Sequence, residues 1–186
     1  YKAKRKRMIK MIKVIALVGS LRKESYNLAL AKYVQEAHKD TLDVEIVDIN
    51  LPLFNEDIEA DPSTEVTNFM EKLGTADAFL FVTPEYNHSV SGVLKNAIDW
   101  ASRGKDLNKK PAFIMGASPG ATGAARAQTH LRQILDTKEM YILPANEVFV
   151  NAAHTKIAEG VLQEEGTKKF IDATVAEFTA WYQLVN

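Results

Sequence analysis

The sequence contains no cysteine, so disulfide bonds, thiolate nucleophiles and cysteine-bound metals are excluded along all 186 residues. It also lacks a strong charge of either sign, since 23 basic residues stand against 24 acidic ones and the formal net charge is −1. Such a balance creates no overall field that would attract nucleic acid or an acidic membrane surface. No hydrophobic run approaches the ~20 residues that a membrane-spanning helix needs. We therefore expect neither nucleic acid nor a membrane as a partner.

The composition, 46% hydrophobic and 25% charged, is typical of a soluble globular protein, and the length suits one domain. The first seven residues form a basic cluster ahead of Met8 and Met11. This cluster fits a nucleic-acid arm or a localisation signal, but we favour the simpler interpretation of vector-derived sequence or a solvated tail. We expect residues 1–10 to be a disordered or vector-derived tail and residues 11–186 to be a single domain. Because the start lacks a signal-peptide hydrophobic region, a cytoplasmic location is expected.

Apolar strands alternate with amphipathic helices along the chain, which predicts an α/β fold with a parallel sheet covered on both faces. The second strand alternates apolar and polar residues, so we place it at a sheet edge and expect the order 2-1-3-4-5. Asn27 is expected to cap the first helix. Strands are predicted at 12–18, 44–49, 78–82, 112–115 and 147–150, and helices at 27–37, 64–73, 90–101, 124–135 and 170–184.

In a sheet of this order, ligands bind beyond the carboxyl ends of the strands, at the switch between the first and third strands. The loops that follow the first, third and fourth strands cover residues 19–27, 83–89 and 116–123. We therefore expect these three loops to meet at one rim of the sheet.

The loop after the first strand offers two hydroxyls, Ser20 and Ser25, the guanidinium of Arg22, the amide of Asn27 and the N–H groups of a helix start. Aligned N–H groups and the helix dipole favour an anion, and an arginine matches phosphate oxygens. The glycines of the dinucleotide fingerprint and of the triphosphate loop are both missing. The loop therefore points to a terminal monophosphate, although Ser25 and Asn27 would equally serve as ordinary helix caps.

The other two loops differ in character. Pro84 fixes the chain direction, and Glu85, Tyr86 and Asn87 follow with donors and acceptors suited to the edge of a heteroaromatic ring. The loop 116–123 carries three glycines and a proline, so its backbone amides can approach a ligand closely. Taken singly, the loop 83–89 is also explained as a turn with a helix cap at Asn87 or Ser89. The loop 116–123 is likewise explained as a tight connector. Their joint placement at the predicted rim favours a binding site.

Four segments together resemble the NAD(P)H-dependent FMN reductases of the flavodoxin-like superfold, which include quinone, azo-dye and chromate reductases. The resemblance extends from about Met11 to Gln183. One departure is that Gly120-Ala121 and Gly123-Ala124 stand where many relatives carry pairs of glycines. The matching segments are Gly-Ser-Leu-Arg-x-x-Ser-x-Asn at 19–27, Pro-Glu-Tyr-Asn at 84–87, Lys-Asn-Ala-Ile-Asp-Trp-Ala-Ser at 95–102, and the 116–123 loop with Gly-Ala-Ala-Arg at 123–126.

The resemblance implies a flavodoxin-like three-layer sandwich that binds FMN tightly and without a covalent bond. It implies a homodimer or homotetramer that pairs through the helices after the third and fourth strands. The residues that it assigns to FMN are Ser20, Leu21, Arg22, Ser25 and Asn27 at the phosphate, Pro84, Glu85, Tyr86 and Asn87 along the ribityl chain and one ring edge, and Ser118, Pro119 and Gly120 on the other side.

The expected activity is ping-pong transfer of two electrons from NAD(P)H through FMN to quinones, azo compounds, metal oxyanions or flavin. Flavin N5 carries the hydride, so we assign no protein side chain a catalytic role and expect no metal. His88 stays unassigned, and Trp100 is expected in packing or a subunit contact.

Two other classes remain open at this point. An electron-carrier flavodoxin would bind FMN without turnover, but such carriers are strongly acidic and enclose the flavin between aromatic rings. Here the net charge is −1, and Tyr86 is the only aromatic residue in the two ring loops. A nucleotide-binding regulator with the same fold would bind no flavin and would be colourless.

Overall fold

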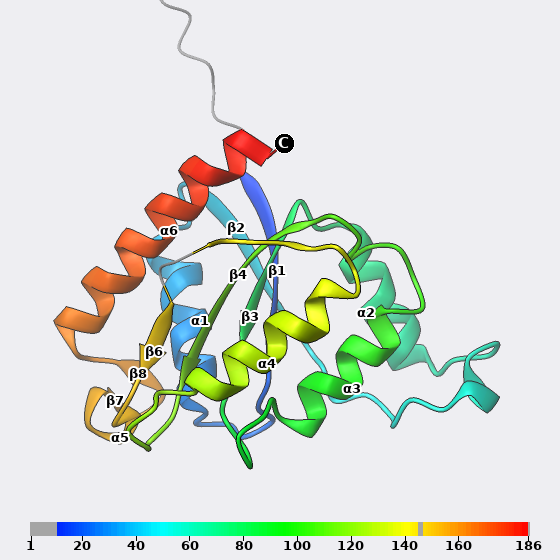
Figure 1. Ribbon diagram of the computed structural model, residues 1–186, viewed down its shortest axis with the longest axis horizontal. Coiled ribbons are helices and arrows are strands. Elements are labelled where there is room, and N and C mark those ends of the chain that lie inside the picture. Colours follow the sequence, from blue (N-terminus) through cyan, green and yellow to red (C-terminus); the bar gives the residue numbers. More distant parts are fainter. Residues whose placement is uncertain (1–10, 145–146, 186) are drawn as a thin grey trace, which may run out of the picture.

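The structure is a computed structural model that describes residues 11–144 and 147–185. Its centre is a parallel sheet in the order β2-β1-β3-β4-β5, with β6 also paired to β4 (Figure 1). This confirms the predicted order. The predicted basic tail, residues 1–10, lies outside the described residues. The central strands are β1 (Ile12–Val18), β3 (Ala78–Val82) and β4 (Pro111–Ala117), and β2 (Leu42–Val47) forms one edge.

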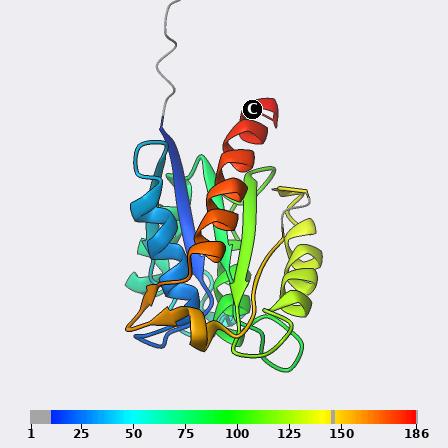
Figure 2. The ribbon, with the colours of Figure 1, turned by 90° about the vertical axis from the view of Figure 1, so that its left-hand side faces the viewer.

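Helices cover both faces of the sheet, so the predicted three-layer sandwich is confirmed. On one face α1 (Tyr26–Ala37) and α6 (Glu165–Val185) bury their apolar sides, and Phe178 of α6 packs 4.4 Å from Phe113 of β4, centroid to centroid. The other face carries α2 (Thr64–Gly74), α3 (Gly92–Ala101) and α4 (Ala125–Asp136). None of the helices in the described ranges has the length and apolar character needed to cross a bilayer. Figure 2 shows the end of α6 projecting beyond one end of the sheet.

The fifth position of the sheet is divided between two short strands, whereas the sequence predicted one strand at 147–150. β5 (Tyr141–Ile142) pairs with the start of β4, and β6 (Val148–Val150) pairs with its end. Pro144, which has no N–H to donate to a ladder, follows β5 closely and explains the break. Four further short elements were not predicted, because two to four residues show no periodicity: η1 (Glu56–Ile58), α5 (Ala153–Lys156), β7 (Ile157–Ala158) and β8 (Val161–Leu162).

Four predicted helix starts are wrong: those of α1 and α4 by one residue, that of α3 by two, and that of α6 by five, because residues 165–169 are polar and show no apolar stripe. Ser25, not Asn27, caps α1, because its Oγ accepts a hydrogen bond from the N–H of Leu28 at 3.3 Å. Asn27 therefore lies inside the first helical turn. Likewise α3 begins at Gly92 and is capped by Ser91, not by Asn87 or Ser89.

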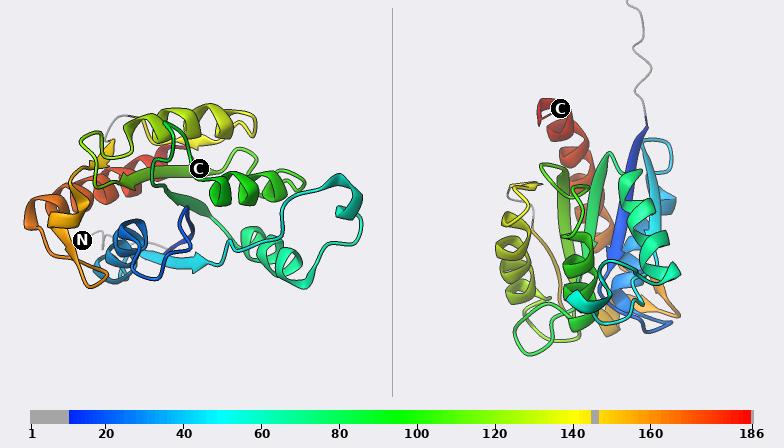
Figure 3. Two further views of the ribbon diagram at one scale, coloured as in Figure 1. Left: turned by 90° about the horizontal axis from the view of Figure 1, so that it is seen from below. Right: turned by 90° about the vertical axis from the view of Figure 1, so that its right-hand side faces the viewer.

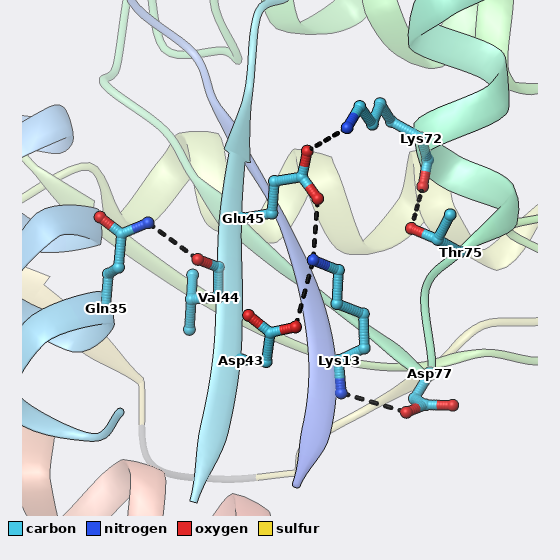
Figure 4. Close-up of polar contacts among 8 residues, drawn as sticks. All are labelled: Lys13, Gln35, Asp43, Val44, Glu45, Lys72, Thr75 and Asp77. Carbon is cyan, nitrogen blue, oxygen red and sulfur yellow. Dashed lines mark hydrogen bonds and ion pairs between the residues drawn. The ribbon is translucent and has the colours of Figure 1, made fainter. Parts of the chain in front are cut away.

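Edge strand β2 is fastened by charged side chains from both neighbouring elements (Figure 4). Glu45 pairs with Lys13 of β1 and Lys72 of α2, each at 2.8 Å, and Gln35 of α1 donates to the carbonyl of Val44 at 2.8 Å. The hydrogen bond from Lys13 is the main reason that the pKa of Glu45 lies below its usual value, and the same bond raises the pKa of Lys13. The bond from Gln35 occupies a backbone carbonyl of this edge strand, a kind of group that exposed strand edges offer to other chains.

The segment after β2 extends away from the sheet as an arm over residues 48–63, cyan in Figure 3. The carboxamide of Asn96 on α3 holds its base, accepting from the N–H of Phe54 at 2.8 Å and donating to the carbonyl of Pro52 at 3.0 Å. The indole of Trp100 also donates to Pro52, at 2.8 Å, and is only 2% exposed. Trp100 is therefore a packing residue of α3.

Candidate functional site

Three loops leave the sheet side by side at its lower edge in Figure 1. The N–H of Gly19 donates to Val82 at 2.8 Å, and the N–H of Thr83 donates to Met115 at 3.0 Å. These bonds extend the ladders one residue beyond the strands, so the loops start at the same level. We name them the first loop (residues 19–25), the second loop (83–91) and the third loop (118–124).

The loops enclose a cleft of about 230 Å³. Their predicted convergence is thus confirmed. Three of the predicted site residues, Leu21, Asn87 and Gly120, are not among the residues that line it, whereas Tyr26 and Ala117, which the sequence did not indicate, are. The lining residues are Ser20, Arg22, Ser25, Tyr26, Asn27, Pro84, Glu85, Tyr86, Ala117, Ser118 and Pro119.

The first loop presents hydrogen-bond donors around the N-terminus of α1. The Oγ atoms of Ser20 and Ser25 accept from the N–H groups of Arg22 and Leu28, at 3.4 and 3.3 Å, so each hydroxyl keeps its own hydrogen to donate. The guanidinium of Arg22 lies 4.8 Å from the centroid of the Tyr26 ring, a cation–π contact that steadies it beside the cleft. This donor set, at the positive end of a helix dipole, suits a phosphate.

Asn27, in the first turn of α1, bonds to the end of β4 directly before the third loop. Its Oδ1 accepts from the N–H of Ala117 at 2.9 Å and its Nδ2 donates to the carbonyl of Ala117 at 3.0 Å. Asn27 is 3% exposed and Ala117 is 2% exposed. A side chain thus forms with β4 the paired bonds that a neighbouring strand would form.

Glu85 links the second loop to α4. Ala124, which precedes this helix, has a left-handed backbone and supplies no side-chain cap. The Oε2 atom of Glu85 instead accepts from the N–H groups of Arg126 and Ala127, at 3.0 and 3.4 Å, and its Oε1 lies 3.7 Å from the guanidinium of Arg126. The Glu85 side chain is 9% exposed. Its carboxylate is therefore directed at a helix start, where it complements the dipole.

The polar run that follows Glu85 forms a tight turn. Tyr86 and Ser89 exchange two backbone hydrogen bonds of 3.0 Å, and Asn87 and His88 between them have φ of 50° and 64°. These are the features of a type I′ turn, in which asparagine is favoured. The Oγ of Ser89 then lies 2.7 Å from Nδ1 of His130 on α4. Tyr86 is 56% exposed at the mouth of the cleft.

The first and second loops approach too closely for a side chain at Gly19. A Cβ atom there would lie 2.9 Å from Oγ of Ser91 and 3.1 Å from Cδ of Pro84. Glycine at this position is therefore required by the contact between the loops.

A second cleft, of about 290 Å³, lies between β2 and α2. Lys72, the one basic residue of its lining, pairs with Glu45 at 2.8 Å. Asp48 and Glu65 add two further acidic groups, so this cleft does not suit an anionic ligand, and it lies away from the three loops. Within the described ranges, no group of three or more histidine or acidic side chains is placed to hold a metal ion. The cleft between the loops is therefore the candidate site.

Residues 12–155 match the family model described as NADPH-dependent FMN reductase. The chain belongs to this family. It is 42% identical to the NAD(P)H-dependent FMN reductase PA1204 of Pseudomonas aeruginosa, over 91% of this chain and 95% of that protein. It is 40% identical to a quinone reductase of Pseudomonas putida, over 95% and 98% of the two chains. Among solved structures, FerB, a flavoenzyme NAD(P)H:(acceptor) oxidoreductase from Paracoccus denitrificans, superposes with a TM-score of 0.84 at 36% identity, covering 93% of this chain and 98% of that one.

The predicted family, enzyme class and cofactors are thereby confirmed: this FMN reductase is an oxidoreductase that uses FMN and NAD(P)H. The alternatives of an electron carrier without turnover and of a regulator without flavin are set aside.

The residues present fit FMN. One end of the cleft is rich in hydrogen-bond donors and suits an anion; it is formed by the hydroxyls of Ser20 and Ser25, the guanidinium of Arg22 and the start of α1. From there the cleft runs between Pro84 to Tyr86 and Ala117 to Pro119, where small side chains expose the backbone of the third loop.

Proposed function

We propose that this FMN reductase passes two electrons from NAD(P)H, by a ping-pong mechanism, to quinones, azo compounds, metal oxyanions or free flavin. The similarity to the quinone reductase of Pseudomonas putida makes quinones the first acceptors to test. The observation that carries the proposal is a cleft with an anion-binding end at the first loop and a small-residue wall at the third.

The protein's own contribution is binding and orientation. Arg22 and the hydroxyls of Ser20 and Ser25 would hold the phosphate of FMN, and the segments from Pro84 and from Ser118 would hold the ribityl chain and the ring. FMN, when bound, supplies the redox chemistry, a two-electron exchange at its N5 atom.

Access to the ring distinguishes an enzyme from a carrier. Tyr86 is the one aromatic residue contributed by the second and third loops, and it is 56% exposed. We infer that one face of the bound ring stays open, so that nicotinamide and acceptor use it in turn. This shared face is the physical basis for the ping-pong order.

Steady-state kinetics with NADH and with NADPH test this proposal over a panel of quinones, azo dyes, chromate and free FMN. Parallel lines in double-reciprocal plots are expected, because the first product leaves before the acceptor binds. Intersecting lines, or bound flavin that NAD(P)H does not bleach in a stopped-flow experiment, would overturn it.

A separate experiment tests whether the first loop binds the FMN phosphate. The double variant Arg22→Ala, Ser25→Ala removes the charge and one hydroxyl while leaving the second and third loops intact. We expect a loss of FMN affinity of about 100-fold, two charge-assisted or hydroxyl contacts at about 1.4 kcal/mol each. Unchanged affinity would refute the assignment of the phosphate to the first loop.

We also propose a homodimer or homotetramer in the cytoplasm, where NAD(P)H is available. Exposed apolar side chains support self-association, since Leu53 on the arm is 81% exposed and Tyr86 is 56% exposed. Sedimentation equilibrium would give the number of subunits directly.

A further inference from the structure

The contact between Asn27 and Ala117 bears on how this enzyme holds its flavin. Both the oxygen and the nitrogen of the Asn27 carboxamide bond to one residue 90 positions away, at 2.9 and 3.0 Å. Ala117 is the last residue of β4, and the next two residues, Ser118 and Pro119, line the cleft. This side chain therefore ties the start of the third loop to the start of α1, beside the first loop.

We propose that Asn27 is a positioning residue, which acts by fixing the third loop against the first and not by contact with the flavin phosphate. This inference rests on the proposed function for its meaning, because the distance that it sets is the width of the flavin cleft. It replaces the expectation that Asn27 binds the phosphate beside Ser25 and Arg22.

The burial of the contact supports this role. Asn27 is 3% exposed, so breaking its bonds leaves the N–H and the carbonyl of Ala117 unpaired and buried, which is costly. A shift of the third loop would expose these two backbone groups to water and so remove that cost. The fold itself has other support there, because Ser118 donates to Val150 and accepts from Ala153, at 3.0 and 3.1 Å. A variant without the carboxamide is thus expected to fold with a displaced or mobile third loop.

A comparison of FMN with riboflavin separates the two roles, since riboflavin lacks the phosphate. If Asn27 positions the loop, Asn27→Ala weakens both ligands by the same factor, about 10-fold, which corresponds to about 1.4 kcal/mol. Arg22→Ala, as the reference for a phosphate contact, weakens FMN by about 10-fold or more and leaves riboflavin within about twofold. An Asn27→Ala variant that loses FMN affinity but keeps riboflavin affinity would overturn the proposal.

Hydrogen–deuterium exchange of the flavin-free protein gives an independent readout. The amide of Ala117 and those of the third loop should exchange faster in Asn27→Ala than in the parent protein. Asn96→Ala is the matched control, because Asn96 is also a buried asparagine, 8% exposed, whose carboxamide bonds to the backbone of another segment. It should lose comparable stability without faster exchange at residues 117–124. Equal exchange in the two variants at these residues would refute the positioning role.

The proposal and the proposed function fail in different ways. If the parent protein bound neither FMN nor riboflavin, the proposed function would be wrong, yet the exchange of the third loop in Asn27→Ala would still report whether Asn27 positions it.

Discussion

Glu85 offers a direct test of how the second loop is held, because its carboxylate caps α4 from outside the helix. The Glu85→Ala variant removes two hydrogen bonds, of 3.0 and 3.4 Å, and an ion pair of 3.7 Å with Arg126. Loss of an N-terminal cap costs about 1 kcal/mol. The ion pair adds about 0.5 kcal/mol, since the Arg126 side chain is 55% exposed and screened by water. We therefore expect a decrease of about 1.5 kcal/mol in the free energy of unfolding.

Equilibrium unfolding in urea, followed by circular dichroism on the flavin-free protein, measures this change without a contribution from ligand binding. For a chain of this length the melting temperature should fall by about 3–6 °C. Glu85→Gln keeps one oxygen as an acceptor and loses only the charge, so it should lose about half as much stability. The matched control is Glu36→Ala, which removes an exposed ion pair with Lys39 on α1 and should cost less than about 0.5 kcal/mol.

The ranking of the three variants is the decisive result. If Glu85→Ala were no more destabilising than Glu36→Ala, the carboxylate would not be the cap of α4. A stabilising link between the second loop and that helix would then be refuted.

Three further variants test other parts of the structure. Gly116→Ala would place a Cβ atom 2.5 Å from the carbonyl oxygen of Thr83, so a loss of about 2–3 kcal/mol is expected in urea unfolding, and an unchanged midpoint would contradict the packing. His88→Gly relieves a left-handed backbone, φ 64°, and should raise stability by about 0.5–1 kcal/mol, whereas a decrease would show that the imidazole makes a needed contact. Glu45→Gln tests the edge of the sheet by its pH dependence. The hydrogen bond from Lys13 holds the pKa of Glu45 below 4.5, so the carboxylate contributes stability above that pH and loses it as pH falls through the folded-state pKa. The difference between parent and variant, about 0.5 kcal/mol at neutral pH, should therefore shrink below about pH 4.5, and a constant difference would exclude the ion pair as its source.

The order of the sheet was predictable because its central strands are buried on both faces and contain almost only apolar residues. Such runs, separated by amphipathic helices, leave few arrangements that bury all of the hydrophobic surface. The carboxyl ends of the strands then had to share one edge, which placed the three loops together. The division of the fifth sheet position between two strands was harder to predict, since β5 contains only two residues, Tyr141 and Ile142.

The individual side chains of the site were harder to predict, because their partners are distant in the sequence. Ser25 and Asn27 are both good caps, and only the position of the first helical residue decides between them. Glu85 was expected to face the flavin, yet its carboxylate meets amides 41 and 42 positions further along the chain. Polar residues after a buried strand thus indicated where the cleft lies, but not which of them bond to other loops and helices.

The placement of the first strand and the last helix has a practical consequence. The start of β1 and the end of α6 both lie at the end of the sheet opposite the three loops (Figures 1 and 2). A surface anchor or a fluorescent reporter attached behind α6 would leave the cleft pointing into solution. Electron transfer to an acceptor dissolved in that solution could then be recorded from molecules that all present the same side.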